Sequence, residues 1–460
     1  MNTNRLLDLL KAHNQDHIIE HFNKLPSNKQ AQFIKSCADL DLDLVFRLNE
    51  ECRGASGALL LTGEIKPANV IPIPETPEEK KYQKAACLAG ESLISQGKVA
   101  VLIVAGGQGV RLGHDKPKGT FPISPVMNKT LFHLFAEQVK ALSIRYGACI
   151  PLLIMTSYEN HAETVAFFDS FGYFGLEQKD IYFFQQGMLP SITPDGQLLL
   201  KDETSLFVNP DGHGGSLRAL YTSGLVDLLA EQGISELFYC QVDNPLVKIA
   251  DPVFLGYHSF ARAQCSTKAV RRTKIEEKVG VYVSVNGKDA ILEYSDFGGR
   301  HMSALDKDGA ILYWAGNTAI HILNLAFIKG LNDHGFALPY HCANKAVEIV
   351  NSAGSTRSVN VWKFETFVFD AIQLATRTCC MEVDRGEEFS PVKNKSGQDS
   401  PSTARQSMIN LHKNWLRDAG VNVPSGPMIE ISPLFALDKE ELINKLKGTI
   451  HSITQDTYFG

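Results

Sequence analysis

The 460-residue sequence lacks several features that mark other classes of protein. It has no excess of positive charge, because 45 lysines and arginines stand against 51 aspartates and glutamates, a net charge of −6. We therefore expect no nucleic-acid partner, and any phosphorylated ligand must be bound by a few local cations. The first residues lack the apolar length of a signal peptide or membrane span, so we expect a cytoplasmic protein with no membrane partner.

Cysteine motifs are also missing. The nine cysteines show neither a C-x-x-C pair nor the Cys/His spacing of a zinc site, and the adjacent Cys379 and Cys380 favour packing over chemistry. This usage is typical of a reducing compartment. A chain of this length exceeds one hydrophobic core, and its pattern predicts a helical N-terminal region (1–97), a catalytic domain (98–374) and a C-terminal region (375–460).

Apolar spacing predicts the secondary structure. Helices are expected in the N-terminal region at 6–11, 17–24, 29–38 and 78–96. Strands then alternate with helices, with strands expected at 99–104, 150–156, 181–185 and 237–242 and helices at 131–143, 162–171 and 216–231. Further short strands are expected at 266–271, 279–285, 290–294 and 311–315, and a polar loop at 393–402 precedes a helix at 404–416. The alternation predicts an α/β fold with a Rossmann-like, mixed but mostly parallel central sheet.

A glycine-rich segment follows the first of these expected strands. Four glycines lie between Gly106 and Gly113, together with Arg111, and Pro117-Lys118-Gly119 comes shortly after. Glycine lets backbone N–H groups approach an anion where a Cβ would collide, and Arg and Lys can neutralise phosphate charge. The segment therefore predicts a site for nucleotide phosphates, although glycines in such turns often serve conformation alone.

Two common phosphate-binding motifs do not fit this segment. A dinucleotide-binding fingerprint would run directly into a helix, whereas Pro117, Pro122 and Pro125 exclude regular helix until about Thr130. A P-loop requires Ser or Thr directly after its lysine, but Lys118 is followed by glycine. A nicotinamide-dependent oxidoreductase is thereby disfavoured, and a non-catalytic nucleotide-binding regulator stays open as an alternative to an enzyme.

Several motifs in the chain resemble those of UTP:sugar-1-phosphate uridylyltransferases, and most nearly the eukaryotic-type UDP-N-acetylglucosamine pyrophosphorylases. Besides the glycine-rich segment, the matching motifs occupy 184–190, 210–215, 242–244, 292–295, 315–317, 367–370 and 389–394. The resemblance implies a nucleotidyltransferase, glycosyltransferase A-like architecture. It also implies UTP and a sugar-1-phosphate as substrates, and Mg²⁺ or Mn²⁺ as cofactor. It makes no prediction of oligomeric state.

Uridylyl transfer needs cations and a metal-binding carboxylate more than a nucleophilic side chain. Arg111 and Lys118 are placed by their loop to contact the leaving pyrophosphate, and the resemblance implies the same role for them. It also makes Lys393 a phosphate ligand from the far side of the cleft. Asp243, at an expected strand end, is the candidate metal ligand and lies by the α-phosphate in the family. Without the resemblance, Asp243 before Asn-Pro could be a turn former and Lys393 a surface lysine.

The remaining candidates rest mainly on the resemblance. It implies nucleotide contacts from Gln186, which can present both donor and acceptor to uracil, and from Gly106, Gly107, Gly212 and His213. It implies sugar contacts from Gly280, Glu293, Asn317, Phe367 and Phe369. By pattern alone, Gln186, Glu293 and Asn317 could be ordinary surface or turn residues. The two phenylalanines, two positions apart on a presumed strand, are more often core residues.

One residue departs from the pattern. His213 stands where the N-acetylglucosamine enzymes have Asn, and the UDP-glucose enzymes have His in their corresponding motif, whereas Gly215 matches the N-acetylglucosamine side. A UDP-glucose or broad UDP-sugar pyrophosphorylase therefore stays open as the alternative substrate class.

Overall fold

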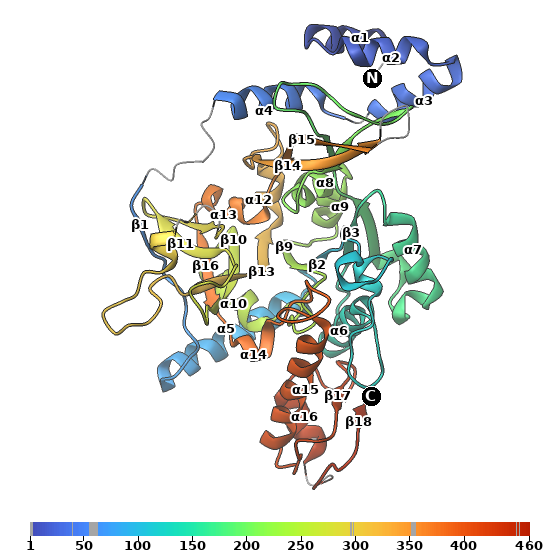
Figure 1. Cartoon of the computed structure of the whole chain (residues 1–460). Helices are drawn as coiled ribbons and strands as arrows, with labels where there is room; N and C mark the ends of the chain where they lie inside the picture. Colours follow the sequence, from blue (N-terminus) through green and yellow to red (C-terminus); the bar gives the residue numbers. More distant parts are fainter. Residues whose placement is uncertain are drawn as a thin grey trace. The chain divides into compact units, whose positions relative to one another are not determined.

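The computed structural model describes residues 3–38, 40–54, 63–294, 297, 299–350, 356–447, 449 and 451–460 (Figure 1). They form two compact units. The small unit contains residues 1–62, 186–219 and 337–370, and the sheet unit contains residues 63–185, 220–336 and 371–460. Both units are thus assembled from segments far apart in the sequence. The division into N-terminal, catalytic and C-terminal regions stays a prediction.

A mixed sheet organises the sheet unit. Ten described strands belong to it: β1 (Ile65–Pro67), β2 (Val99–Val104), β3 (Leu152–Thr156), β4 (Ile181–Gln185), β9 (Glu236–Gln241), β10 (Cys265–Arg271), β11 (Val281–Val285), β12 (Lys288–Leu292), β13 (Ala315–Asn324) and β16 (Thr378–Glu382). The order is β1-β11-β13-β9-β2-β3-β4, and β9, β2, β3 and β4 are mutually parallel. Strands β2 and β3 are buried nearly throughout, as expected for parallel strands covered on both faces. The predicted α/β architecture is confirmed.

The chain reverses its direction of travel across the sheet at β2. It passes from β2 to β3 and β4 on one side, and later places β9 on the other side of β2. In open α/β sheets, the crevice at the carboxyl ends of such a pair of strands is where ligands bind. The segments that leave β2 and β9, which contain the glycine-rich segment and Asp243, therefore emerge side by side.

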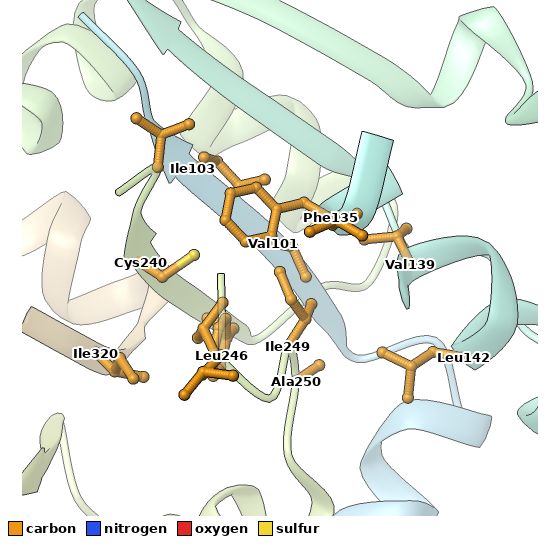
Figure 2. Packing of buried hydrophobic residues seen from close by; sticks show 14 of the residues in the cluster. Val101, Ile103, Phe135, Val139, Leu142, Cys240, Leu246, Ile249, Ala250 and Ile320 are labelled. Atoms are coloured by element: carbon orange, nitrogen blue, oxygen red, sulfur yellow. The ribbon is translucent and has the colours of Figure 1, made fainter. Parts of the chain in front are cut away.

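Helix α6 (Leu131–Tyr146) covers β2 and forms the centre of the core. Figure 2 shows Val101 and Ile103 of β2 with Phe135, Val139 and Leu142 of α6. These helix residues recur at intervals of four and three, so they share one face. The helix begins after Thr130, whose hydroxyl accepts the His133 N–H, and ends at Gly147 with φ of 62°. The core thus holds β2 in place, and the glycine-rich segment departs from the carboxyl end of this strand.

The antiparallel part of the sheet contains one error of prediction. The strand expected at 311–315 is wrong: Ile311 makes only an isolated bridge with Leu305, and β13 begins at Ala315. The first half of β13 is an irregular strand: its register shifts opposite β10, and Ala319 has a φ of 57°. Pairing with β10 and β9 on its two sides, rather than local propensity, makes this segment a strand.

The sheet unit contains further regular elements besides its main sheet. They are α5 (Pro77–Ser95), η1 (Val110–Leu112), η2 (Lys118–Thr120), α7 (His161–Ser170), η3 (Gly172–Gly175), η4 (Gln178–Asp180), α9 (Leu225–Glu231), α10 (Pro252–Phe260), α11 (Gly299–Met302), α12 (Leu325–Gly330), α13 (Ala371–Leu374), α14 (Arg385–Glu388), α15 (Pro401–Asp418), β17 (Ile429–Ile431), α16 (Lys439–Leu446) and β18 (Thr457–Phe459). The absence of helix between residues 121 and 130 confirms the prediction made from the prolines. Among the described residues, no helix is long and apolar enough to cross a lipid bilayer.

The small unit packs helices against hairpins. Its elements are α1 (Thr3–Ala12), α2 (Asp16–Lys24), α3 (Ser27–Cys37), α4 (Leu42–Gly54), β5 (Met188–Pro190), β6 (Leu200–Asp202), β7 (Ser205–Leu206), β8 (Val208–Pro210), β14 (His341–Val350), β15 (Thr356–Glu365) and η5 (Val368–Asp370). Apolar residues of the helices form one cluster with Leu189, Ile192 and Phe364. The helices predicted at 6–11, 17–24 and 29–38 are confirmed here, and the one predicted at 78–96 is α5 of the sheet unit. Helix α4 and the β14–β15 hairpin were not predicted.

Two local predictions fail in or next to this unit. The helix expected at 216–231 is divided into α8 (Gly215–Thr222) and α9 by Gly224, whose φ of 75° interrupts a helix. Phe367 and Phe369 do not lie on a strand, because β15 ends at Glu365 and Phe369 belongs to the 3₁₀ turn η5.

Candidate active site

The glycine-rich segment folds into a loop closed at its base. An isolated bridge joins Gln108 to Pro117, and the Lys118 N–H donates to the Gly107 carbonyl at 3.1 Å. The loop's glycines differ in purpose. A Cβ at Gly109 or Gly119 would collide with His114 or Phe132, whereas no described atom lies within 4 Å of where a Cβ at Gly107 would be. Packing does not explain the glycine at 107, so the open space above its backbone fits the approach of a ligand.

A buried asparagine holds this loop from below. Asn160 has no exposed surface, and its Nδ2 donates to the carbonyls of Ala105 at 2.9 Å and Gly107 at 3.4 Å. Its Oδ1 accepts the Ser157 N–H at 2.8 Å, just beyond β3. Asn160 therefore ties the ends of β2 and β3 together and fixes the backbone of the loop. It was not predicted, since nothing local distinguishes it from the N-terminal residue of a helix.

Lys118 and Asp243 meet at the carboxyl ends of β2 and β9. The Lys118 Nζ lies 3.6 Å from Asp243 Oδ2, and the side chains are 18% and 14% exposed. The Asp243 carbonyl accepts the Val392 N–H at 2.8 Å, which places Lys393 next to the same point. Lys393 is itself exposed, and its N–H donates to the Asp399 carbonyl at 2.7 Å. The structure thus brings the predicted Lys118, Asp243 and Lys393 together, and Arg111 is exposed on η1 of the same loop.

The segment that carries Lys393 is anchored by its neighbours. Asn244 donates to the Glu388 carbonyl at 2.7 Å and accepts the Ser390 N–H at 3.0 Å. The Glu388 carboxylate in turn accepts from Lys268, whose Nζ also lies 2.6 Å from Asp251 Oδ2. Lys268 is completely buried, and these two carboxylates compensate its positive charge. A buried ionic cluster therefore supports the backbone from which Lys393 extends.

The predicted sugar-contacting residues of the sheet unit also lie together. The Asn317 N–H donates to the Gly280 carbonyl at 2.8 Å, and a Cβ at Gly280 would lie 3.3 Å from Glu293 Oε1. Asn317 uses its Oδ1 to accept the Ala319 N–H at 2.9 Å. Ser295, the last residue of the matching 292–295 motif, lies outside the described residues.

His213, Phe367 and Phe369 form a cluster of their own in the small unit, and Gln186 of the same unit directly follows β4. His213 stacks on Phe367 with ring centroids 5.3 Å apart, and Phe369 lies 5.7 Å from it. His213 Nδ1 accepts the Val368 N–H at 3.2 Å. Burial, together with the charge of nearby His341, lowers the pKa of His213 to about 4, so the ring is neutral at pH 7. Gly212 has a φ of 86°, and a Cβ there would lie 2.8 Å from the Thr366 nitrogen.

Asp211, beside this cluster, was not predicted to matter. It is 4% exposed, its Oδ1 has no hydrogen-bond partner among the described residues, and a Cβ at Gly187 or Gly215 would collide with its carboxyl group. Burial raises the pKa of Asp211 to about 7, an effect opposed by the positive charge of Arg218. The two motifs that contain Gln186 and Gly212 thus enclose one buried carboxyl group.

We expect the Asp211 carboxyl to make stability depend on pH. The folded protein holds its proton up to about pH 7, whereas the unfolded chain releases it near pH 3.8, so the free energy of unfolding falls as pH rises through that range. The effect is on the order of 2–4 kcal/mol. Asp211→Asn should therefore raise the Tm at pH 8 more than at pH 5. Calorimetry at both pH values tests this, with exposed Asp169→Asn as control, and an equal shift at both would contradict it.

Comparison with known proteins agrees with this arrangement. Residues 62–455 match the sequence family described as "UTP--glucose-1-phosphate uridylyltransferase". The chain belongs to this family. A UDP-N-acetylglucosamine pyrophosphorylase of Saccharomyces cerevisiae is 35% identical over 88% of each chain. UDP-N-acetylglucosamine diphosphorylase 2 of Arabidopsis thaliana is 33% identical over 97% of this chain and 92% of its own.

Solved structures extend the comparison. The crystal structure of the uridine diphosphate N-acetylglucosamine pyrophosphorylase from Trypanosoma brucei, in complex with inhibitor, has a TM-score of 0.81 and 25% identity, and covers 98% of each chain. A UDP-glucose phosphorylase from the same organism is 20% identical with a TM-score of 0.63, a likeness of fold alone. The uridylyltransferase family and its fold, as predicted from the motifs, are therefore confirmed, whereas the roles of individual residues stay predictions.

Proposed function

We propose that this protein is a uridylyltransferase that makes UDP-N-acetylglucosamine and pyrophosphate from UTP and N-acetylglucosamine-1-phosphate. One observation carries the proposal: Lys118, Asp243 and the backbone of Lys393 meet where β2 and β9 end, beside a glycine loop with open space above Gly107. The names of the S. cerevisiae, A. thaliana and T. brucei relatives support the same activity and the same sugar.

The proposed reaction needs charge neutralisation and alignment. An oxygen of the sugar phosphate attacks the α-phosphorus of UTP, the bond to the β-phosphate breaks, and pyrophosphate leaves on the opposite side. Lys118 and Arg111 would neutralise the charge that grows on the leaving group, and the backbone at Gly106 and Gly107 would hold the phosphates in line. Lys393 would contact phosphate from the neighbouring segment.

Asp243 is the residue that would hold a divalent cation. Among the described residues, no group of three or more His, Cys, Asp or Glu side chains is placed to bind a metal. The single carboxylate of Asp243 fits Mg²⁺ or Mn²⁺ bound together with substrate. Mg²⁺ typically takes one or two carboxylates and completes its shell with phosphate oxygens and water. A bound ion would supply further neutralisation of phosphate charge.

Each of the two residue clusters has its own proposed part in substrate recognition. In the sheet unit, Glu293 and Asn317 would bind sugar hydroxyls or the acetamido group, with Gly280 allowing close approach of backbone. In the small unit, Gln186 would bind uracil with the backbone of Gly212. The proposed role of His213 is to support Phe367 and Phe369 through ring stacking and its hydrogen bond to the backbone between them. We propose a cytoplasmic location, which the nine free cysteines fit.

Pyrophosphate release measured with UTP, Mg²⁺ and a panel of sugar-1-phosphates tests the proposal. The panel contains N-acetylglucosamine, N-acetylgalactosamine and glucose. Turnover fastest with N-acetylglucosamine-1-phosphate is the expected result. A preference for glucose would indicate the alternative UDP-glucose specificity, and binding of UTP without pyrophosphate release from any sugar would indicate a non-catalytic regulator.

We expect kcat/KM for N-acetylglucosamine-1-phosphate to exceed that for glucose-1-phosphate by at least about 100-fold. A site with polar groups paired to an acetamido substituent leaves them unpaired with glucose, and buried unpaired groups are costly. Asn317→Ala should lower this ratio, because the Asn317 carboxamide is the proposed hydrogen-bond partner of the acetamido group. Asn286→Ala, which replaces a surface asparagine elsewhere on the sheet unit, should leave it unchanged. An unaltered ratio in Asn317→Ala would remove that residue from sugar selection.

A further inference from the structure

A buried arginine lies beneath the proposed sugar-contacting residues and is not needed for any role assigned so far. Arg272 is 4% exposed and immediately follows β10. Its guanidinium donates to the carbonyls of Tyr313 at 3.1 Å, Ile275 at 2.7 Å and Met302 at 3.4 Å. A single planar group therefore joins three separate segments of backbone.

Two of those three segments lead directly to Gly280 and Asn317. Ile275 lies in the loop that leads from Arg272 to Gly280, and Tyr313 lies two residues before β13, the strand that contains Asn317. The Arg272 Cγ would be 3.4 Å from a Cβ placed at Gly316, so the side chain passes directly under the residue before Asn317. The Arg272 N–H also donates to the Trp314 carbonyl at 2.8 Å. Arg272 thus contacts both segments of backbone that meet in the Asn317–Gly280 hydrogen bond.

The outer side of the same loop is held separately. The Glu277 carboxylate accepts the Thr273 N–H at 3.0 Å and pairs with Arg385 at 2.5 Å. Arg272 makes no such ion pair among the described residues: its acceptors are all carbonyls, and its buried Nε has no hydrogen-bond partner there. Burial lowers the pKa of its guanidinium, an effect opposed by the negative charge of Glu277. A buried charge satisfied only by carbonyls is costly, and lysine could not supply the same planar set of donors.

We propose that Arg272 is a positioning residue that fixes Gly280 and Asn317 for the sugar-1-phosphate. The proposal rests on the proposed function, since it takes Gly280 and Asn317 to be sugar contacts. It predicts a selective effect: loss of the guanidinium weakens use of the sugar-1-phosphate, while UTP, bound through the glycine loop, is used with nearly unchanged KM.

Steady-state kinetics of Arg272→Lys and Arg272→Met in the full chain test this. We expect KM for N-acetylglucosamine-1-phosphate to rise about tenfold in the lysine variant and about 100-fold in the methionine variant, with KM for UTP within twofold of wild type. Arg417→Met is the control, because Arg417 also donates to a backbone carbonyl, that of Val423, but lies on α15. It should change neither KM.

The outcomes separate this inference from the proposed function. If the wild-type protein releases no pyrophosphate with any sugar, the proposed function fails. If the wild type is active but Arg272→Lys raises both KM values equally or neither, the positioning role is overturned and Arg272 serves stability alone. If Arg272→Met does not fold, the lysine variant, checked by its Tm, decides the question.

Discussion

Lys118→Ala is expected to lower kcat by about 10²–10³-fold, the size seen when one donor to a developing negative charge is removed. The residue lies on the phosphate loop, its N–H is bonded to Gly107, and its Nζ faces the carboxylate at the end of β9. Because the leaving pyrophosphate gains charge in the transition state, the loss should fall mainly on kcat. Measuring kcat and KM for UTP tests this directly.

Two further variants make this test sharper. Lys116→Ala removes an exposed cation two residues away on the same loop and should alter kcat less than threefold, which controls for a general change of loop charge. Lys118→Arg keeps the charge but changes its shape, so it should retain more activity than the alanine variant. If Lys118→Ala turns over at nearly the wild-type rate, the lysine has no role in stabilising the leaving group.

The parallel half of the sheet can be predicted from the sequence, for a physical reason. Val99–Val104, which is buried inside the sheet, and Ile181–Gln185, which is a partly buried edge strand, could both be predicted to the residue. Each forms a short, continuous apolar run between polar turns. Parallel strands place their carboxyl ends at one edge of the sheet. The convergence of Lys118 and Asp243 therefore followed from the order of the elements.

Residues that act through distant partners were not predicted. Asn160 holds the glycine loop and Arg272 joins three backbone segments, yet both act through hydrogen bonds to carbonyls, which any residue supplies. No sequence motif records such a contact. Phe367 and Phe369 show the same limit. Their spacing of two is typical of one face of a strand, but the two residues lie at a 3₁₀ turn, where both rings contact His213.

The second large effect is expected at Asp243. Asp243→Asn should raise the Mg²⁺ concentration needed for half-maximal activity and lower kcat, each by about 100-fold, the upper end of the range for disturbing even the outer partners of a metal. An amide can still accept hydrogen bonds, but it lacks the charge that binds a hard cation. Activity titrated with Mg²⁺ at saturating UTP and sugar-1-phosphate tests this.

Asp243 also faces Lys118, so a loss of activity alone would not identify a metal ligand. Asparagine leaves Lys118 without its carboxylate partner, and the freed ammonium should bind phosphate at least as well as before. KM for UTP at saturating Mg²⁺ should therefore stay constant or fall, while the midpoint of the Mg²⁺ titration rises. Asp115→Asn, an exposed carboxylate on the glycine loop, should leave the midpoint in place. An unchanged midpoint in Asp243→Asn, with KM for UTP raised, would instead mean that Asp243 orients Lys118 and that the metal is held elsewhere.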